Sequence, residues 1–115
     1  MRPFTFIAAL VAIAAALALP SVAPAGTGSS TLVGTDGPGF TITMSKKTVK
    51  AGTYTIVIHD KSNIHNFHLN GPVSRVFTSV SFKGTKTVTL TLKPGKYTYV
   101  CDPHATSMRG SFRVS

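Results

Sequence analysis

Residues 87–92 read TVTLTL, an alternation of hydroxyl-bearing and aliphatic side chains that is typical of a β-strand with one buried face. The same alternation occurs in residues 40–44, FTITM, and in residues 53–58, TYTIVI. Short turn-forming sequences such as KAGT, NGP and KPGK separate the runs. Helical periodicity is hard to find in this part of the chain. The pattern therefore predicts an all-β protein.

Nine segments have strand-like composition, and we expect seven or eight of them to form strands. They are residues 31–34, 39–44, 47–50, 53–59, 65–70, 75–81, 86–92, 96–101 and 110–114. Short strands at this turn spacing indicate a two-sheet antiparallel Greek-key sandwich. The sequence shows no internal repeat and no second domain.

The first residues, MRPFTFIAALVAIAAALALPSVAPAG, have the layout of a secretory signal peptide. One basic residue precedes an apolar run from Phe4 to Leu19, and a small-residue triplet ends at Ala25. We expect cleavage after Ala25, which leaves a flexible lead-in at residues 26–31 and one domain at residues 32–115. The alternative is an uncleaved anchor, but a helix of this run spans about 24 Å against a hydrocarbon core of roughly 30 Å. The predicted location is therefore secreted or extracytoplasmic, such as a periplasm.

The expected mature chain is strongly basic. Without Arg2 it keeps 11 of the 12 basic residues against three aspartates, a net charge of +8. Export argues against a nucleic-acid partner. The charge is compatible with a soluble monomer that repels its own copies, or with attraction to an acidic redox protein, an anionic cell-surface component or a membrane surface.

Cys101 is the only cysteine, so no disulfide can form within the chain. A buried inert thiol is the common outcome for a lone cysteine. Here the stretch CDPHATSM also holds His104 and Met108, and Pro103 stiffens the link between thiol and imidazole. Calcium and magnesium prefer oxygen ligands, and zinc binds thioethers poorly. Copper accepts this combination, with a long contact to the thioether sulfur.

A trigonal copper site needs a second histidine, and His59, His65 and His68 are the candidates. On a regular strand His65 and Phe67 would face one side and His68 the other. His59 lies beside Asp60, where we expect a solvated turn. The residues alone leave the choice between His65 and His68 open.

Two motifs resemble those of the cupredoxins, the superfamily of small blue copper proteins that includes plastocyanin, amicyanin and azurin. HNFHL, residues 65–69, is similar to the family's His-Asn pair on a middle strand. YTYVCDPHATSM, residues 97–108, is similar to its Tyr-x-Tyr/Phe-x-Cys-x-Pro-His run ending in Met. The resemblance in strand pattern extends over nearly all of residues 26–115.

The resemblance implies one copper ion held by His65, Cys101 and His104, with Met108 as the axial ligand. It further implies that Asn66 ties the His65 segment to the Cys101 loop, and that Phe67 lines an apolar collar. Two features depart from plastocyanin: Val100 replaces an aromatic residue next to the thiolate, and acidic docking patches are absent. A photosynthetic partner therefore does not follow.

The resulting hypothesis is a secreted mononuclear type 1 copper protein that carries single electrons between redox partners. The alternative in the same site is a copper-binding module for capture, transfer or sensing. A metal-free structural sandwich is a third interpretation. We do not expect an enzyme, because superfamily oxidases and reductases need further domains and copper sites, and three acidic residues offer no catalytic pair.

Overall fold

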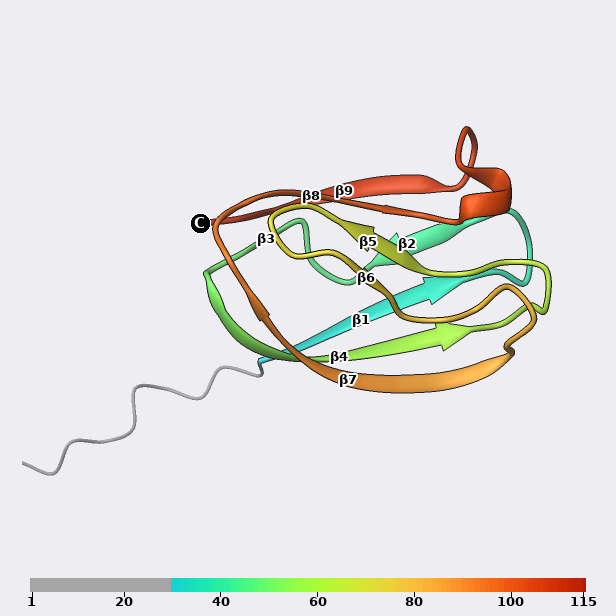
Figure 1. Ribbon diagram of the computed structural model, residues 1–115, viewed down its shortest axis with the longest axis horizontal. Helices are drawn as coiled ribbons and strands as arrows, with labels where there is room; N and C mark the ends of the chain where they lie inside the picture. Colours follow the sequence, from blue (N-terminus) through green and yellow to red (C-terminus); the bar gives the residue numbers. More distant parts are fainter. Residues whose placement is uncertain (1–29) are drawn as a thin grey trace, which may run out of the picture.

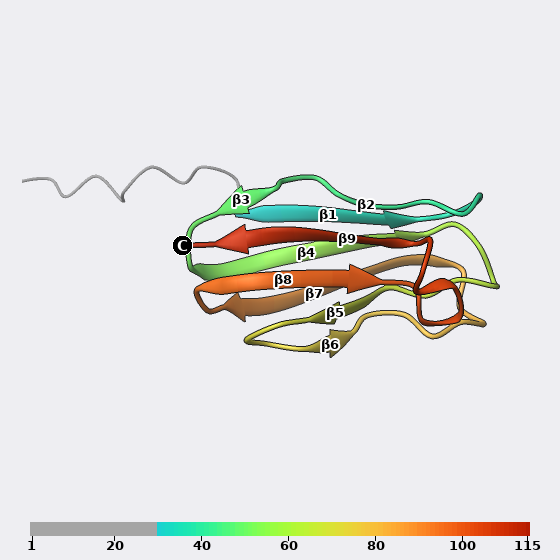
Figure 2. The same ribbon diagram turned by 90° about the horizontal axis from the view of Figure 1, so that it is seen from above.

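A computed structural model describes residues 30–115, which form a sandwich of two β-sheets (Figures 1 and 2). One sheet has the strand order β2-β1-β4-β7 and the other β3-β9-β8-β5-β6. The strands are β1 Thr31–Asp36, β2 Ile42–Met44, β3 Thr48–Val49, β4 Gly52–Asp60, β5 His68–Asn70, β6 Arg75–Val76, β7 Gly84–Leu92, β8 Gly95–Val100 and β9 Arg109–Val114. Within residues 30–115 there is also one 3-10 turn, η1 Asp102–His104, between β8 and β9. Within residues 30–115, no helix is both long and apolar enough to cross a membrane.

The sandwich confirms the predicted all-β class, with one correction to its strand pairing. Most neighbouring strands are antiparallel, but β1 pairs with β4 in parallel and β3 pairs with β9 in parallel. Both sheets are therefore mixed and not purely antiparallel. Composition reveals which segments are extended but not which way their neighbours run.

Four predicted strands have half their expected length or less in the structure. The one expected at residues 39–44 is only Ile42–Met44, and the one at 47–50 is only Thr48–Val49. The expected strand at residues 65–70 is only His68–Asn70, and the one at 75–81 is only Arg75–Val76. The backbone N–H of Phe67 donates to the side-chain oxygen of Thr78 at 2.9 Å, so regular pairing stops before this point. Phe67 and Thr78 are both buried, and the segment enters the core as a loop.

The core lies between the sheets and is rich in aromatic side chains. Tyr97 stacks on Phe112 with ring centroids 5.1 Å apart, and Phe67 stacks on Tyr99 at 5.6 Å. A Cβ on Gly110 would overlap the ring of Tyr99, which faces it across the β8–β9 pair. Aromatic packing therefore stiffens the two strands that lead into and out of the Cys101 loop.

Two buried carboxyl groups end neighbouring strands at the same level. Asp36 is the last residue of β1, Asp60 the last of β4, and the two are register partners. Their exposed fractions are 0% and 2%. Apart from the contact between the two carboxyl groups, both oxygens of Asp36 and one of Asp60 have no hydrogen-bond partner within residues 30–115. Burial, and then the neighbouring Asp60, raise the pKa of Asp36 to about 8, so this carboxyl holds a proton at neutral pH.

Candidate metal centre

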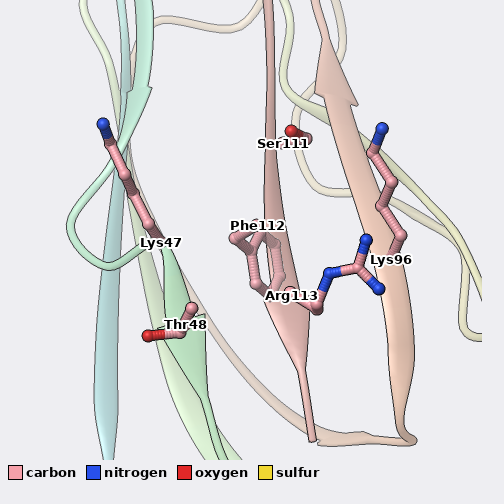
Figure 3. A pocket seen from close by; sticks show the side chains of 6 residues that line it. All are labelled: Lys47, Thr48, Lys96, Ser111, Phe112 and Arg113. Carbon is pink, nitrogen blue, oxygen red and sulfur yellow. The ribbon is translucent and has the colours of Figure 1, made fainter.

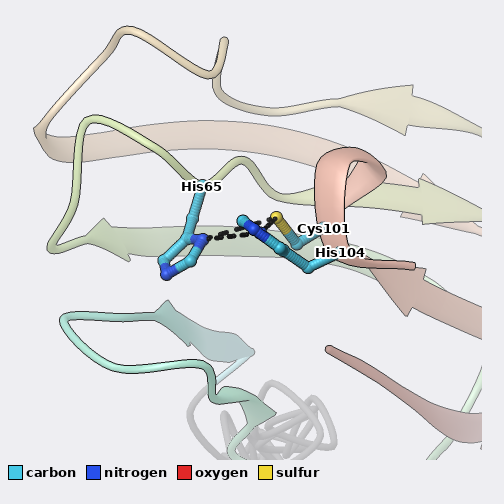
Figure 4. A group of neighbouring side chains, drawn as sticks. All are labelled: His65, Cys101 and His104. Carbon is cyan, nitrogen blue, oxygen red and sulfur yellow. Dashed lines mark hydrogen bonds between the residues drawn. The ribbon is translucent and has the colours of Figure 1, made fainter. Parts of the chain in front are cut away.

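Three donor side chains meet at one end of the sandwich, beside η1 (Figure 4). His65 lies in the loop between β4 and β5, Cys101 directly follows β8, and His104 ends η1. The two Nδ1 atoms are 3.1 Å apart, and Cys101 Sγ lies 3.7 Å from that of His65 and 3.6 Å from that of His104. His65 and Cys101 are fully buried, whereas His104 is half-buried.

The triangle of donor atoms has the size of a first-row metal site. A point in its plane lies about 2.0 Å from all three atoms, and metal bonds to protein nitrogen and sulfur are about 2.0–2.3 Å for an ion such as zinc. Two imidazoles and one thiolate in a trigonal arrangement are the donor set of blue copper sites. The residues present therefore fit a copper ion.

His65 reaches this triangle from a loop, which corrects the expectation that it projects from a strand. It is buried together with Asn66 and Phe67, so three consecutive residues point into the protein. A regular strand cannot do this, because alternate side chains face opposite sides. His68 is the first residue of β5 and points to the outer face, away from the donor triangle.

The link between the His65 loop and the Cys101 loop is a pair of hydrogen bonds. Asn66 Nδ2 donates to Asp102 Oδ2 at 2.8 Å, and the backbone N–H of Asp102 donates to Asn66 Oδ1 at 2.7 Å. His68 Nδ1 lies 3.0 Å from Asp102 Oδ1. Partial burial on its own would raise the pKa of Asp102. The hydrogen bonds from Asn66 and His68 outweigh this effect, so the pKa lies below its usual value. An ionised Asp102 thus holds both loops in register.

Backbone hydrogen bonds fold residues 101–108 into a tight loop. Cys101 N–H donates to Met108 O at 3.0 Å, His104 N–H to Cys101 O at 3.0 Å, and Met108 N–H to His104 O at 2.8 Å. The side chain of Met108 is fully buried. Pro103 lies inside η1, where its missing N–H costs no hydrogen bond. These contacts fix the spacing between thiol and imidazole.

Phe40 covers the two imidazoles, a role that no sequence pattern indicates. Its ring meets His65 edge-on at 5.3 Å between centroids and His104 at 4.9 Å, although 61% of its surface is exposed. Phe40 lies in the loop between β1 and β2, 25 or more positions away from either histidine. Only the folded chain brings it to the site.

The fourth histidine lies outside the centre, and its surroundings differ from those predicted. His59 is half-buried within β4 and not in a solvated turn. Its Nδ1 lies 3.1 Å from the Thr85 hydroxyl on the neighbouring strand β7. His59 and its partner Thr85 therefore belong to the β2-β1-β4-β7 sheet, whereas Cys101 follows a strand of the other sheet.

Residues 29–115 match the family described as copper binding proteins, plastocyanin/azurin family. The chain belongs to this copper-binding family. The prediction of copper as the cofactor is confirmed by this family membership and by the cluster of His65, Cys101 and His104. No curated protein matches the sequence.

Solved structures of auracyanin and rusticyanin have the same fold as this cupredoxin. Auracyanin from the photosynthetic bacterium Roseiflexus castenholzii aligns over 76% of this chain and 98% of its own, with 18% identity and a TM-score of 0.52. Reduced rusticyanin aligns over 74% and 78%, with 24% identity and a TM-score of 0.55. Rusticyanin from Thiobacillus ferrooxidans aligns over 74% and 76%, with 22% identity and a TM-score of 0.52. At these identities the likeness establishes the fold alone.

Proposed function

We propose that this cupredoxin is an exported type 1 copper protein that carries single electrons between redox partners. The observation that carries the proposal is the triangle of two imidazole nitrogens and one thiol sulfur, with sides of 3.1–3.7 Å. Copper supplies a one-electron couple when it is bound. Donor atoms that the fold keeps in this arrangement would move little between the two oxidation states, which would lower the reorganisation needed for each transfer.

In this proposal the Met108 thioether would supply a further sulfur ligand to the copper. The Met108 side chain is fully buried, and the Met108 backbone closes the Cys101 loop on both sides. A long, weak contact to a thioether is the usual fourth interaction in blue copper sites. Asn66, Phe67 and Pro103 position the ligands: Asn66 through Asp102, Phe67 through its stacking on Tyr99, and Pro103 by restricting η1.

We propose that electrons enter and leave through His104, because it is the most exposed of the three donors. The residues near it in the fold or in the sequence include two exposed apolar side chains, the Asp102 carboxylate and one arginine. Phe40 and Ile64 are 61% and 49% exposed, and Arg109 follows Met108 directly. Such a surface suits brief docking of an acidic redox protein, with a rate that falls as salt is added.

Export of a monomeric mature chain, after cleavage at Ala25, is part of the same proposal. It rests on the leader-like sequence of residues 1–25, which lie outside the described residues. We assign the chain no catalytic reaction, because its one donor cluster among the described residues supports electron carriage without a substrate site.

The test is the visible spectrum of residues 26–115 after addition of Cu(II), followed by voltammetry. We expect an intense thiolate-to-copper band and a reversible one-electron wave, both lost in Cys101→Ser. Absence of the band would overturn the site assignment. A band without a reversible wave, together with rapid copper donation to an acceptor protein, would instead support the copper-capture alternative.

A further inference from the structure

The basic side chains of the described residues are unevenly distributed along the sandwich. Six of the eleven gather at the end opposite the copper site, which we call the base: Lys46, Lys47, Lys50, Lys93, Lys96 and Arg113. Strand pairing fixes their common location. Gly52 faces Leu92, Gly95 faces Val114, and Val49 pairs with Val114, so the segments carrying these cations meet where the chain ends (Figure 1).

The acidic side chains of residues 30–115 all lie toward the other end. Asp36 and Asp60 are buried at the ends of β1 and β4, and the Asp102 carboxylate accepts hydrogen bonds at the metal centre. Within residues 30–115, no acidic side chain therefore forms an ion pair with the cations of the base. The charge of the molecule is polarised along the strand direction, with the copper site at the less basic end.

Part of the base is an open hollow lined by Lys47, Thr48, Lys96, Ser111, Phe112 and Arg113 (Figure 3). Lys96 and Arg113 are direct cross-strand partners, and Figure 3 shows their side chains next to each other. Like charges facing each other across an antiparallel pair are destabilising. Two hydroxyl groups lie beside them, so an oxyanion would find both charge and hydrogen-bond donors.

We propose that the base docks on an anionic phospholipid surface and holds the copper end away from it. The binding chemistry is that of lipid headgroup phosphates against lysine and arginine side chains. The site is separate from the copper centre, and it does not depend on whether copper carries electrons.

The surface of the base favours headgroups over a protein partner. Protein interfaces have an apolar and aromatic core surrounded by polar residues. The large exposed hydrophobic side chains of residues 30–115 are Phe40, Ile64, Val76 and Val80, and none belongs to the base. Long flexible lysines without an apolar centre suit a laterally mobile layer of negative charge.

The direction of the chain agrees with this orientation. β1 begins at the base, where the carbonyl of Ser30 accepts the N–H of Thr55. Cys101 lies six residues beyond Gly95, a strand length of about 20 Å from the base. Docking at the base thus leaves His104 open to a diffusing partner.

The first test is sedimentation of copper-loaded residues 26–115 with vesicles of phosphatidylcholine containing phosphatidylglycerol. All nine strands lie within residues 30–115, so this chain keeps the complete fold. We expect binding at low salt that disappears near 0.5 M salt, and none to pure phosphatidylcholine. The triple variant Lys47→Gln, Lys96→Gln, Arg113→Gln should bind about a hundredfold more weakly, because each basic side chain near such a surface contributes roughly fivefold.

The matched control removes the same charge from the other end: Lys61→Gln, Lys83→Gln, Lys86→Gln. It should bind far more tightly than the base variant at the same net charge. Equal weakening in the two triple variants would overturn the proposal, since binding would then follow net charge alone. Binding of soluble polyphosphate with the same variant dependence, but not of vesicles, would also overturn it.

Orientation is tested by NMR with a gadolinium chelate attached to the lipid headgroup. We expect amide broadening around Lys50, Lys93 and Lys96 and little around Asn63 and Ser107. Equal broadening at both ends would overturn the orientation. Metal-free protein should give the same result, so a failure of copper loading leaves this test intact.

Discussion

The buried Asp36–Asp60 pair should make the free energy of unfolding fall as the pH rises. The pKa of Asp36 is raised to about 8, mainly by burial and also by Asp60. Between pH 4 and 8 the folded chain therefore keeps a proton that the unfolded chain releases. Because the unfolded state then binds fewer protons, its population is favoured as the pH increases.

The size of this effect follows from the shift itself. Four pKa units correspond to about 5–6 kcal/mol, which is an upper limit because partly hydrated interiors respond less than dry ones. We expect about 2–3 kcal/mol between pH 5 and pH 8.5. The contribution is complete below the unfolded pKa near 4 and is lost as the pH passes the folded value near 8.

Asp36→Asn tests this reasoning directly. The amide has nearly the same shape, carries no charge at any pH, and can donate a hydrogen bond to Asp60. At pH 5 the variant should lie within about 1 kcal/mol of the parent chain, and at pH 8.5 it should be more stable by about 2–3 kcal/mol. Urea unfolding of the metal-free proteins at the two pH values gives both differences.

Asp102→Asn is the matched control, because hydrogen bonds lower the pKa of Asp102. It is compared in a His68→Gln background, which removes the imidazole 3.0 Å from Asp102, so replacement of the ionised carboxylate should change stability by the same amount at pH 5 and 8.5. If Asp36→Asn also shows no pH-dependent difference, the buried carboxyl does not hold a proton and the argument is wrong.

Three further changes probe the metal centre. Cys101→Ser should abolish the thiolate-to-copper band while the far-ultraviolet circular dichroism stays unchanged; a surviving band would contradict the ligand assignment. Asn66→Ala removes two hydrogen bonds between the site loops and should lower the free energy of unfolding by about 1–3 kcal/mol, whereas the exposed control Asn63→Ala should have little effect in the same urea titration. Phe40→Ala uncovers the edge of His104 and should speed removal of Cu(I) by a chelator, measured by loss of colour on reoxidation; an unchanged rate would show that the ring does not shield the site.

The long alternating strands were predictable because each has one face in the core. The predicted bounds of β4, β7 and β8 lie within two residues of the observed ends, since an alternation of six or more residues is characteristic of a half-buried strand. The parallel pairings were not predictable. They depend on contacts between segments that share no turn, and local sequence contains no information about such partners.

The local half of the metal centre was also visible in the sequence. Cys101 and His104 lie three residues apart in a loop that a proline stiffens, and the donor types themselves indicate a soft metal. The placement of His65 was harder to predict. Its segment is buried at three consecutive positions, whereas the alternating pattern used to predict strands places every second side chain on the outer face. Phe40 carries no chemical signal at all, because its contribution is a contact made only after folding.

The stability of the centre therefore depends on one long-range connection more than on the Cys101 loop. Backbone hydrogen bonds would hold residues 101–108 in shape in many surroundings. His65 comes from a different part of the chain, and Asn66 places it through Asp102. Because the Asp102 carboxylate accepts from both Asn66 and His68, the two loops stay in register through side chains that never touch the metal. Loss of the Asn66 side chain should thus loosen His65 while residues 101–108 keep their shape.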